Sequence, residues 1–274
     1  MSIALAATLH DSTGALRAEV RRRLPALRRL YPAGLAVATS PPTATSMRSC
    51  LEAAGVHAGS PRANARGPLY RLALQRALET GAEHVHYLDF DRALHWQAAL
   101  PDEYVAVLRT AVRHAGVLIG RTERAHRSHH RPLYATEAIV NRLLADRLGW
   151  LGRLDFLVPS FVLSRRATEV LLRESRARDA AVYGELAALV AATRGLAYVE
   201  CRGLQWETPD RHRRAVARLG LPAWRRRFDT PEEWKLRTDL AAAFVRGFEN
   251  TSARVRPVRR RPLRLRTPVR RAST

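Results

Sequence analysis

The sequence predicts an α/β protein in which helices flank a mainly parallel central sheet. Through the first half of the chain, short apolar runs alternate with amphipathic helical segments, which is the pattern of repeated βα units. An apolar strand expected at 84–88 ends in the acidic triplet Asp89-Phe90-Asp91, and open α/β sheets bind their ligands at the carboxyl ends of strands. The 274-residue chain is 46% hydrophobic, which is enough to bury a sizeable core.

The first half of the chain carries the clearest pattern. We expect strands at 3–9, 34–39, 56–58 and 84–88, and helices at 16–30, 46–54 and 66–80. Apolar residues recur every three or four positions in the first helix, which predicts one buried face. They are Leu16, Val20, Leu24 and Leu27.

The second half continues with helices expected at 101–115, 135–148, 166–176 and 180–192, and strands at 117–120, 156–163 and 197–201. The last 24 positions, 251–274, differ in composition. They are rich in Pro and Arg, and nine arginines fall between Arg254 and Arg271 without one acidic residue. This tail has too little apolar content to offset the entropy of ordering it, so we expect disorder there.

The formal net charge is +22, and Lys235 is the sole lysine among 47 basic residues. A surface this positive attracts anions, which include nucleotide phosphates, anionic lipid headgroups and nucleic acid. We expect the basic tail to allow peripheral contact with an anionic inner membrane surface. No zinc finger or helix-turn-helix pattern is present, so nucleic acid is not an expected partner.

The two cysteines, Cys50 and Cys201, lie far apart and form no CxxC motif or Cys/His cluster. Neither a disulfide framework nor a zinc site is indicated, and we expect free thiols in the cytoplasm. The apolar run at the N-terminus is too short and lacks the basic leader of a signal peptide. No segment reaches the roughly 20 apolar residues of a membrane-spanning helix.

Asp89 and Asp91 are the strongest chemical signal, because they follow an apolar strand and are separated by one residue. Mg²⁺ and Mn²⁺ prefer oxygen ligands and are often held by one or two carboxylates together with substrate phosphates. The pair therefore predicts a divalent cation site. The alternative is a solvated acidic turn without a ligand.

The surrounding sequence resembles GT-A type glycosyltransferases, in which a helix that carries arginine precedes a strand ending in DxD. The resemblance extends in order over about residues 1–215 and rests on Arg66-Gly-Pro-Leu-Tyr-Arg71, Ala77, Gly81, His86-Tyr-Leu-Asp-Phe-Asp91 and Phe161-Val-Leu-Ser-Arg165. It implies a Rossmann-like GT-A fold, a nucleoside-diphosphate sugar donor and a Mn²⁺ or Mg²⁺ cofactor. It leaves the acceptor open among a sugar, a small hydroxy compound and a lipid-linked molecule.

The same resemblance implies a single catalytic domain over 1–250, with a nucleotide-sugar-binding half at 1–100 and an acceptor half at 101–250. Asp89 and Asp91 would hold the metal, and Asp89 would also contact the donor. Asp11, at the end of the first strand, becomes a donor contact. Arg66 or Arg71 would lie near the diphosphate, the alternative for each being an arginine on the helix surface.

Candidates in the second half are carried by the resemblance and by local composition. Enzymes of this type that invert the anomeric centre use a carboxylate as general base, and Glu185 at a helix start is a candidate. Its alternative role is that of an ordinary acid in the first turn of a helix.

The irregular run 203–212 is polar and aromatic, and loops of this kind often belong to sites. We expect Trp206 and Glu207 to contact the acceptor, and His212 or Asp210 to complete the metal shell. The alternatives are a partly buried tryptophan and a plain surface loop.

Three histidines, His126, His129 and His130, alternate with arginines in the segment 123–131. The positive charges disfavour a metal site, so we expect an exposed basic loop that closes over the donor phosphates.

Other classes of protein remain as alternatives. Asp89-Phe-Asp-Arg-Ala-Leu94 resembles the nucleophile motif of haloacid dehalogenase phosphatases, but Ala93 replaces the expected hydroxyl residue and only Lys235 is available as the required lysine. Nucleotidyltransferases usually carry a glycine-rich, lysine-bearing loop after the first strand, which is missing. A protein that binds nucleic acid or other anions on a transferase-like scaffold is the third alternative.

Overall fold

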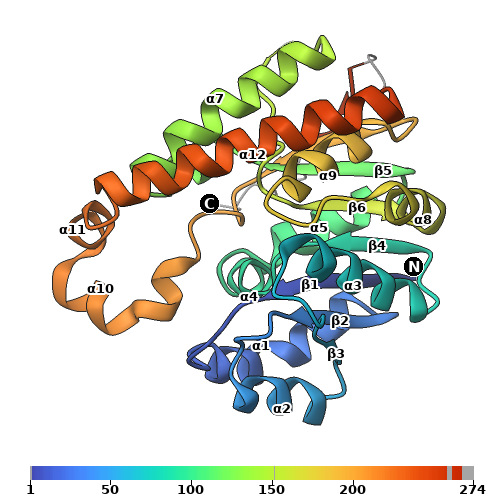
Figure 1. Ribbon diagram of the computed structural model, residues 1–274. Coiled ribbons are helices and arrows are strands. Elements are labelled where there is room, and N and C mark those ends of the chain that lie inside the picture. Colours follow the sequence, from blue (N-terminus) through green and yellow to red (C-terminus); the bar gives the residue numbers. More distant parts are fainter. Residues whose placement is uncertain (1, 151, 258–260, 267–274) are drawn as a thin grey trace, which may run out of the picture.

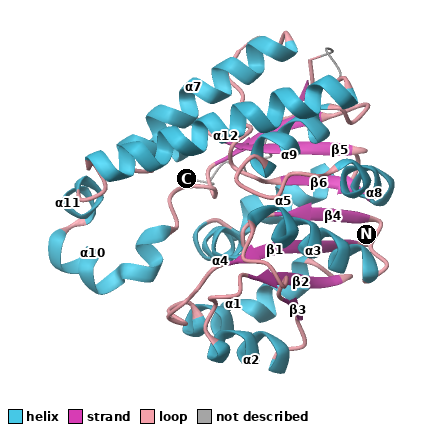
Figure 2. Ribbon diagram, viewed as in Figure 1, coloured by secondary structure: helices cyan, strands magenta, loops and turns pink. Residues whose placement is uncertain are grey.

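The computed structural model describes residues 2–150, 152–257 and 261–266. Eight strands form one sheet in the order β3-β2-β1-β4-β6-β5-β7-β8, and helices cover both of its faces (Figures 1 and 2). The strands are β1 (Ile3–Leu9), β2 (Gly34–Thr39), β3 (His57–Gly59), β4 (His84–Tyr87), β5 (Gly116–Arg121), β6 (Phe161–Ser164), β7 (Ala197–Cys201) and β8 (Leu263–Arg264).

The helices before β6 are α1 (Arg17–Leu30), α2 (Thr45–Ala53), α3 (Arg66–Glu79), α4 (Phe90–Ala99), α5 (Pro101–Ala111), α6 (Glu123–Arg127) and α7 (Arg131–Leu148). Those after it are α8 (Arg165–Glu174), α9 (Val182–Ala191), α10 (Arg213–Leu219), α11 (Leu221–Arg226) and α12 (Pro231–Val255), with the 3₁₀ helix η1 (Thr208–His212) ahead of α10. Figure 1 shows α7 and α12 side by side, leading at one end to α10 and α11.

The sheet is mainly parallel, as the sequence predicts. β1, β2, β3 and β4 pair in parallel, and so do β5 with β7 and β7 with β8. β6 runs antiparallel to both of its neighbours, β4 and β5. The predicted α/β class, with a mainly parallel sheet flanked by helices, is therefore confirmed.

Two hydrophobic cores lie on the two faces of the sheet, and β1 contributes to both. Its side chains alternate, as the period of a strand requires, so that Ala4 and Ala6 face one core while Ile3 and Leu5 face the other. The first core is completed by α3, α7, α8, α9 and α12, and the second by α1, α2, α4 and α5.

The register of the parallel strands creates the site. Leu9 of β1 pairs with Thr39 of β2, and Ala6 pairs with Tyr87 of β4. The residues that follow these strands therefore emerge at one edge of the sheet, where open α/β sheets bind ligands.

The strand expected at 156–163 begins only at Phe161. The backbone just before it is bound by side chains, because Phe156 N donates to Asn141 Oδ1 at 2.7 Å and Asp155 N donates to the Tyr198 hydroxyl at 3.1 Å. These groups are thus not available for a strand ladder.

The disorder expected for 251–274 is wrong for the described part of that segment. Residues up to Val255 belong to α12, where Thr251 is buried, and Leu263–Arg264 forms β8. Leu263 N donates to Leu196 O at 3.3 Å and Leu265 N to Tyr198 O at 2.8 Å. Backbone pairing, which needs no apolar side chains, orders this stretch; 258–260 and 267–274 lie outside the described residues. Within the described ranges, no helix is long and apolar enough to cross a bilayer.

Candidate functional site

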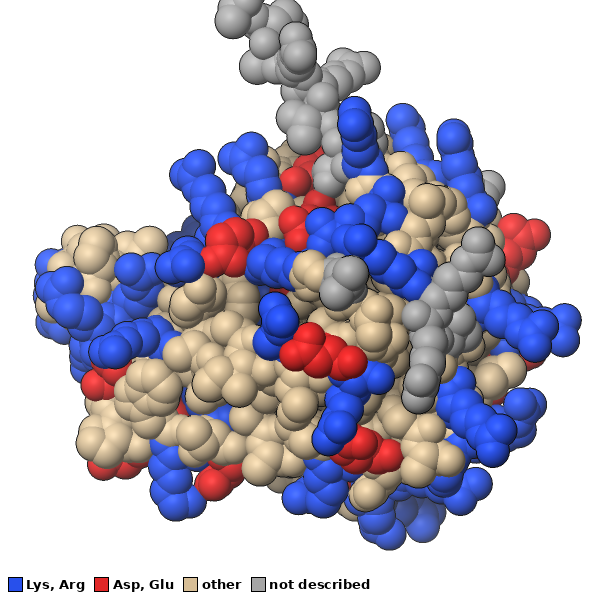
Figure 3. Space-filling model, turned by 90° about the horizontal axis from the view of Figure 1, so that it is seen from above, with Lys and Arg blue, Asp and Glu red and all other residues tan. Residues whose placement is uncertain are grey.

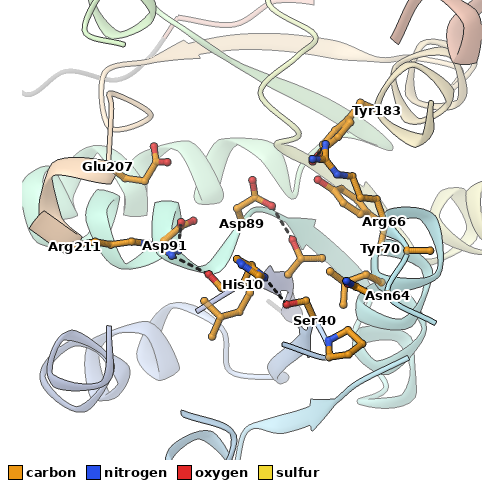
Figure 4. A pocket seen from close by; sticks show the side chains of 15 residues that line it. His10, Ser40, Asn64, Arg66, Tyr70, Asp89, Asp91, Tyr183, Glu207 and Arg211 are labelled. Atoms are coloured by element: carbon orange, nitrogen blue, oxygen red, sulfur yellow. Dashed lines mark hydrogen bonds and ion pairs between the residues drawn. The ribbon is translucent and has the colours of Figure 1, made fainter. Parts of the chain in front are cut away.

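A cavity of about 510 Å³ opens at the carboxyl ends of β1, β2 and β4 (Figure 4). Most of its lining comes from loops after these strands, from the start of α3 and from η1. The lining side chains are Thr8, Leu9, His10, Ser40, Pro41, Asn64, Ala65, Arg66, Leu69, Tyr70, Asp89, Asp91, Tyr183, Glu207 and Arg211.

Asp89 lies at the end of β4, immediately before α4. Its Oδ1 accepts hydrogen bonds from Thr8 Oγ1 at 2.8 Å and the Tyr87 hydroxyl at 3.3 Å, and its Oδ2 lies 3.6 Å from Arg92 Nε. Desolvation raises the pKa of Asp89 to about 6; Arg92 acts in the opposite direction, and Asp91 adds to the rise. The site therefore disfavours the Asp89 anion unless a further positive charge is present.

Asp91 is in the first turn of α4, and an arginine of η1 meets it. Arg211 donates to Asp91 Oδ2 at 2.6 Å and to the carbonyl oxygen of His10 at 2.8 Å. One guanidinium thus joins η1 to the end of β1 and to the start of α4. No local pattern indicates this contact, apart from the position of Arg211 between the two candidates Asp210 and His212.

Three carboxylates line this part of the cavity: those of Asp89, Asp91 and Glu207 (Figure 4). They offer the all-oxygen donor set that Mg²⁺ or Mn²⁺ prefers. Among the described residues, no group of three or more His, Cys, Asp or Glu side chains is placed so that it could hold a metal ion. Asp89 and Asp91 offer a cation two carboxylates, and Arg211 occupies one of the Asp91 oxygens.

The opposite wall is aromatic and carries Arg66. The guanidinium carbon of Arg66 lies 5.5 Å from the centre of the Tyr183 ring, and the rings of Tyr70 and Tyr183 meet edge to face at 5.3 Å. Arg66 is the first residue of α3, and the next residue allows the close packing of this helix end. A Cβ on Gly67 would lie only 1.8 Å from the carbonyl oxygen of Ala177.

The remaining polar groups lie after β1, β2 and β3. His10 Nδ1 and Ser40 Oγ are 2.7 Å apart, and Asn64 lies beside them in the lining (Figure 4). No sequence pattern distinguishes His10, Ser40, Asn64 or the two tyrosines, because polar residues in loops and aromatic residues in helices are common whether or not they belong to a site.

Asp11 does not line the cavity, contrary to its expected role. It is buried, and its two carboxylate oxygens accept the backbone N–H groups of Ala15 and Leu16, each at 3.0 Å. These bonds fix the turn that leads into α1. Asp11 therefore stabilises the loop after β1 and does not face a donor.

Arg71 and Glu185 also lie outside the lining, and together they hold the loop 175–177. Arg71 donates to the carbonyl oxygen of Ala177 at 2.8 Å, while the Glu185 carboxylate accepts from Arg176 N at 2.8 Å, Ala177 N at 2.9 Å and the Ser175 hydroxyl. Glu185 is buried away from solvent. Its position does not suit a base, and both residues act on the site indirectly, because the loop they hold packs against the start of α3.

The run 203–212 contributes to the cavity through Glu207 and Arg211. Glu207 is 9% exposed, and its Oε2 lies 3.9 Å from Arg92 Nε. Trp206, expected at the acceptor, is buried instead against the rings of His130, Trp224 and Phe228 at 5.0 to 5.5 Å. Trp206 therefore holds the run 203–212 against these aromatic side chains.

His212 and Asp210 are also directed away from the carboxylates. The exposed His212 ring lies 5.5 Å from that of Trp224, and Asp210 Oδ2 is bound to His95 Nδ1 at 2.7 Å. Neither residue lines the cavity in this arrangement.

The segment 123–131 is not the exposed loop that its composition suggests. His126, His129 and His130 are buried, and most of the segment is helical. The reason is a buried ion network at the end of β5: Arg121, fully buried, bonds Asp155 at 2.6 Å and Glu137 at 2.5 Å. Burial alone would raise the pKa of Asp155, but Arg121 overcomes this and holds it far below its usual range.

No family model matches the sequence, and no curated protein matches it. The structure is similar to glucosyl-3-phosphoglycerate synthase from Mycobacterium tuberculosis, solved in complex with Mn²⁺ and UDP-glucose, with 16% identity, a TM-score of 0.43 and coverage of 81% of this chain and 67% of that one. It is also similar to mannosyl-3-phosphoglycerate synthase from Rubrobacter xylanophilus, with 18% identity, a TM-score of 0.49 and coverage of 84% and 75%. At this level of similarity, neither structure assigns an activity to this chain.

Proposed function

We propose that the chain is a GT-A-type glycosyltransferase that takes its sugar from a nucleoside-diphosphate donor with the help of a divalent cation. The observation that carries the proposal is the cavity itself. Asp89 and Asp91 stand at the end of β4, and Arg66 stands across the same cavity of about 510 Å³. This volume lies in the usual range for a small-molecule or cofactor site.

The chemistry of the wall fits the parts of such a donor. A diphosphate is multiply charged, and Arg66 offers it a planar guanidinium across the cavity from the carboxylate pair. The polar groups of His10, Ser40 and Asn64 can hydrogen-bond a base and ribose at the ends of β1 and β2. A cation bound by Asp89 and Asp91 supplies neutralising charge for the departing nucleoside diphosphate.

Glu207 is the best-placed carboxylate for the acceptor. It lines the cavity on the η1 side, and its Oε2 has no hydrogen-bond partner among the described residues. We propose that this oxygen accepts the proton of the acceptor hydroxyl as that hydroxyl attacks the sugar, while the bond between the sugar and the diphosphate breaks. Glu207 replaces Glu185 in this role.

The phosphatase alternative loses support from the position of its lysine. Lys235, the sole lysine, is 78% exposed on α12 and bound to Asp239 at 2.7 Å, and it does not line the cavity. The required partner for an aspartyl nucleophile at Asp89 is therefore missing from the site.

The acceptor, the cytoplasmic location and contact of the basic tail with an anionic membrane stay predictions. Part of that tail is docked as β8, where the guanidinium of Arg264 lies 5.6 Å from the centre of the Tyr198 ring. The side chains of both residues of β8 stay exposed, so docking of this strand leaves its basic side chain at the surface.

The test is a thermal-shift screen of the purified chain against UDP, GDP and their common sugar conjugates, each with and without Mn²⁺. A ligand that binds only the folded state raises the melting temperature, by an amount that grows with its concentration over Kd. We expect one nucleotide to give a shift that requires Mn²⁺, which would also name the base. Absence of a shift with every nucleotide would contradict the proposal.

A further inference from the structure

A second cavity, of about 360 Å³, lies where α6, the start of α7 and α11 meet. Of the described residues, none lines both this cavity and the donor cavity. Its most prominent feature is four arginines, Arg127, Arg131, Arg225 and Arg226. Figure 3 shows basic side chains gathered at the left of the molecule, where α10 and α11 lie.

The acids near this cavity do not balance these charges. Arg127 pairs with Glu123, and Arg131 lies 3.6 Å from Asp229. Arg226 is exposed and has no ion-pair partner in the described part of the chain. Four guanidinium groups therefore face two carboxylates, which leaves an excess of positive charge in a concave site.

Arg225 gives the cavity a fixed wall. It donates to the carbonyl oxygens of Arg127 at 3.3 Å and Ser128 at 3.4 Å, which ties α11 to the end of α6. The aromatic ring of Tyr134 stands at 4.9 Å from the guanidinium carbon of Arg127 and restrains that side chain as well. Donors that are already held in place lose less entropy when they bind an anion.

The lining also contains a buried hydrogen-bond acceptor. His129 lines the cavity and is only 2% exposed, and its Nε2 has no hydrogen-bond partner among the described residues. Its Nδ1 lies 3.2 Å from the carbonyl oxygen of Ala125. A carbonyl can only accept, so Nδ1 carries the hydrogen and Nε2 of the neutral ring offers a lone pair.

The neutral form of His129 follows from its surroundings. Burial lowers its pKa well below the usual value, and the positive charges of Arg121 and Arg92 lower it further. In addition, α7 begins at Arg131, and the side chain of its N-cap residue, His130, makes no capping bond. The N-terminus of this 18-residue helix thus adds a favourable field for an anion at the cavity wall.

We propose that this second cavity binds inorganic phosphate. Its ionised oxygens would meet the guanidinium groups, and its protonated oxygen would donate to His129 Nε2. The inference is independent of the proposed glycosyltransferase activity, because it uses none of the residues of the donor cavity.

Because the cavity combines hydrogen-bond donors with one hydrogen-bond acceptor, His129, it should prefer phosphate to sulfate. Near neutral pH, phosphate carries a proton that His129 can accept, whereas sulfate has the same shape and no proton. Titration calorimetry of the full chain with each anion should show tighter binding of phosphate. Equal binding of the two anions would overturn the role of His129.

Two variants distinguish phosphate binding in this cavity from non-specific attraction of phosphate to the positive surface. Loss of two charge-assisted contacts in the double variant Arg127→Gln/Arg226→Gln should weaken phosphate binding by about tenfold or more. Arg227→Gln removes the same kind of charge from an exposed neighbour outside the lining and should leave it within about twofold. Binding unaffected by the double variant, or weakened equally by the control, would contradict the proposal.

A substitution of His129 tests whether its Nε2 accepts the phosphate proton. His129→Leu should bring phosphate affinity down to that for sulfate, because only phosphate uses Nε2. The melting temperature of this variant identifies any loss of fold, and the phosphate-to-sulfate ratio is read on the folded fraction. A preference for phosphate that survives in His129→Leu would contradict the assignment.

Discussion

Arg211 and Asp91 form a 2.6 Å ion pair that joins η1 to the first turn of α4 across the side of the donor cavity. Both side chains are about one-fifth exposed, so the pair is neither fully buried nor freely solvated. The other Asp91 oxygen accepts the N–H of Arg92 at 2.9 Å, so a divalent cation bound to Asp91 would meet an oxygen that is already engaged. Arg211 and the cation therefore compete for Asp91.

Removal of Arg211 should increase the affinity of the nucleotide-free protein for Mn²⁺. A partly exposed ion pair is worth roughly 0.2–1 kcal/mol, so Arg211→Gln should tighten Mn²⁺ binding by up to about fivefold. Arg214→Gln, an exposed arginine on α10, is the matched control and should change little. Free Mn²⁺ can be followed by electron paramagnetic resonance. Unchanged or weaker Mn²⁺ binding by Arg211→Gln would show that there is no competition.

Glu185 and Glu207 should behave differently when they are substituted. Glu185→Ala leaves the partly buried N–H groups of Arg176 and Ala177 and the buried Ser175 hydroxyl without an acceptor, so we expect a loss of stability of about 2–4 kcal/mol in urea unfolding. Glu207→Gln should keep its stability within about 1 kcal/mol, since its Oε2 lacks a hydrogen-bond partner in the described structure, and should lose sugar transfer.

Glu169→Ala, at an exposed position of α8, is the control for the first substitution and should be nearly neutral. A Glu185→Ala protein that is fully stable but inactive would instead support Glu185 as the base.

The buried network at Arg121 should be essential for folding. Arg121→Met leaves Asp155 and Glu137 without their buried positive partner, and breaking a buried ion pair in this way typically costs about 3–5 kcal/mol. Arg124→Met, at an exposed position of α6, removes the same charge without this consequence. Unfolding free energies from urea titration measure both. Similar stabilities for the two variants would contradict the role of the network.

Acid should destabilise the protein through His86. Burial lowers the pKa of His86 to about 3 in the fold, where it lies between the Tyr31 hydroxyl at 2.6 Å and Ser160 Oγ at 3.3 Å. Below about pH 6.5 the unfolded chain binds a proton at this residue and the folded chain does not, so stability falls by about 1.4 kcal/mol per pH unit until the folded pKa is reached.

The comparison of two variants isolates this contribution. His86→Gln should flatten the slope of unfolding free energy against pH between about 6 and 4 by that amount, whereas His57→Gln, at an exposed position of β3, should leave it unchanged. Parallel slopes for wild type and His86→Gln would contradict the lowered pKa.

The parallel half of the fold was predictable because it rests on local signals. β1, β2 and β4 are apolar runs of strand length, and their order along the chain places Asp89 at a ligand-binding edge. The antiparallel direction of β6 was not predictable, since its four residues would look the same in either direction. β8 was missed because backbone groups hold it, within a composition typical of disorder.

The candidate site residues also differ in whether local sequence signals could predict them. Asp89, Asp91 and Arg66 reach the cavity through the element to which each belongs. Glu207 was indicated by the polar run 203–212, whereas Arg211 was not. Both reach the cavity because this run packs over the aromatic cluster of Trp206, which is a long-range contact. Asp11 and Glu185 were predicted to belong to the site but do not line the cavity. A carboxylate that binds backbone N–H groups cannot be told from sequence apart from one that faces a substrate.

The central claim is that Asp89 and Asp91 hold a divalent cation against a donor diphosphate, and titration calorimetry tests it most directly. The nucleotide identified by the thermal-shift screen is titrated, with and without Mn²⁺, into wild type, Asp91→Asn and the control Asp102→Asn, an exposed acid at the start of α5. We predict that Mn²⁺ strengthens binding in wild type and Asp102→Asn and has little effect in Asp91→Asn. An equal effect of Mn²⁺ on all three proteins would contradict the claim.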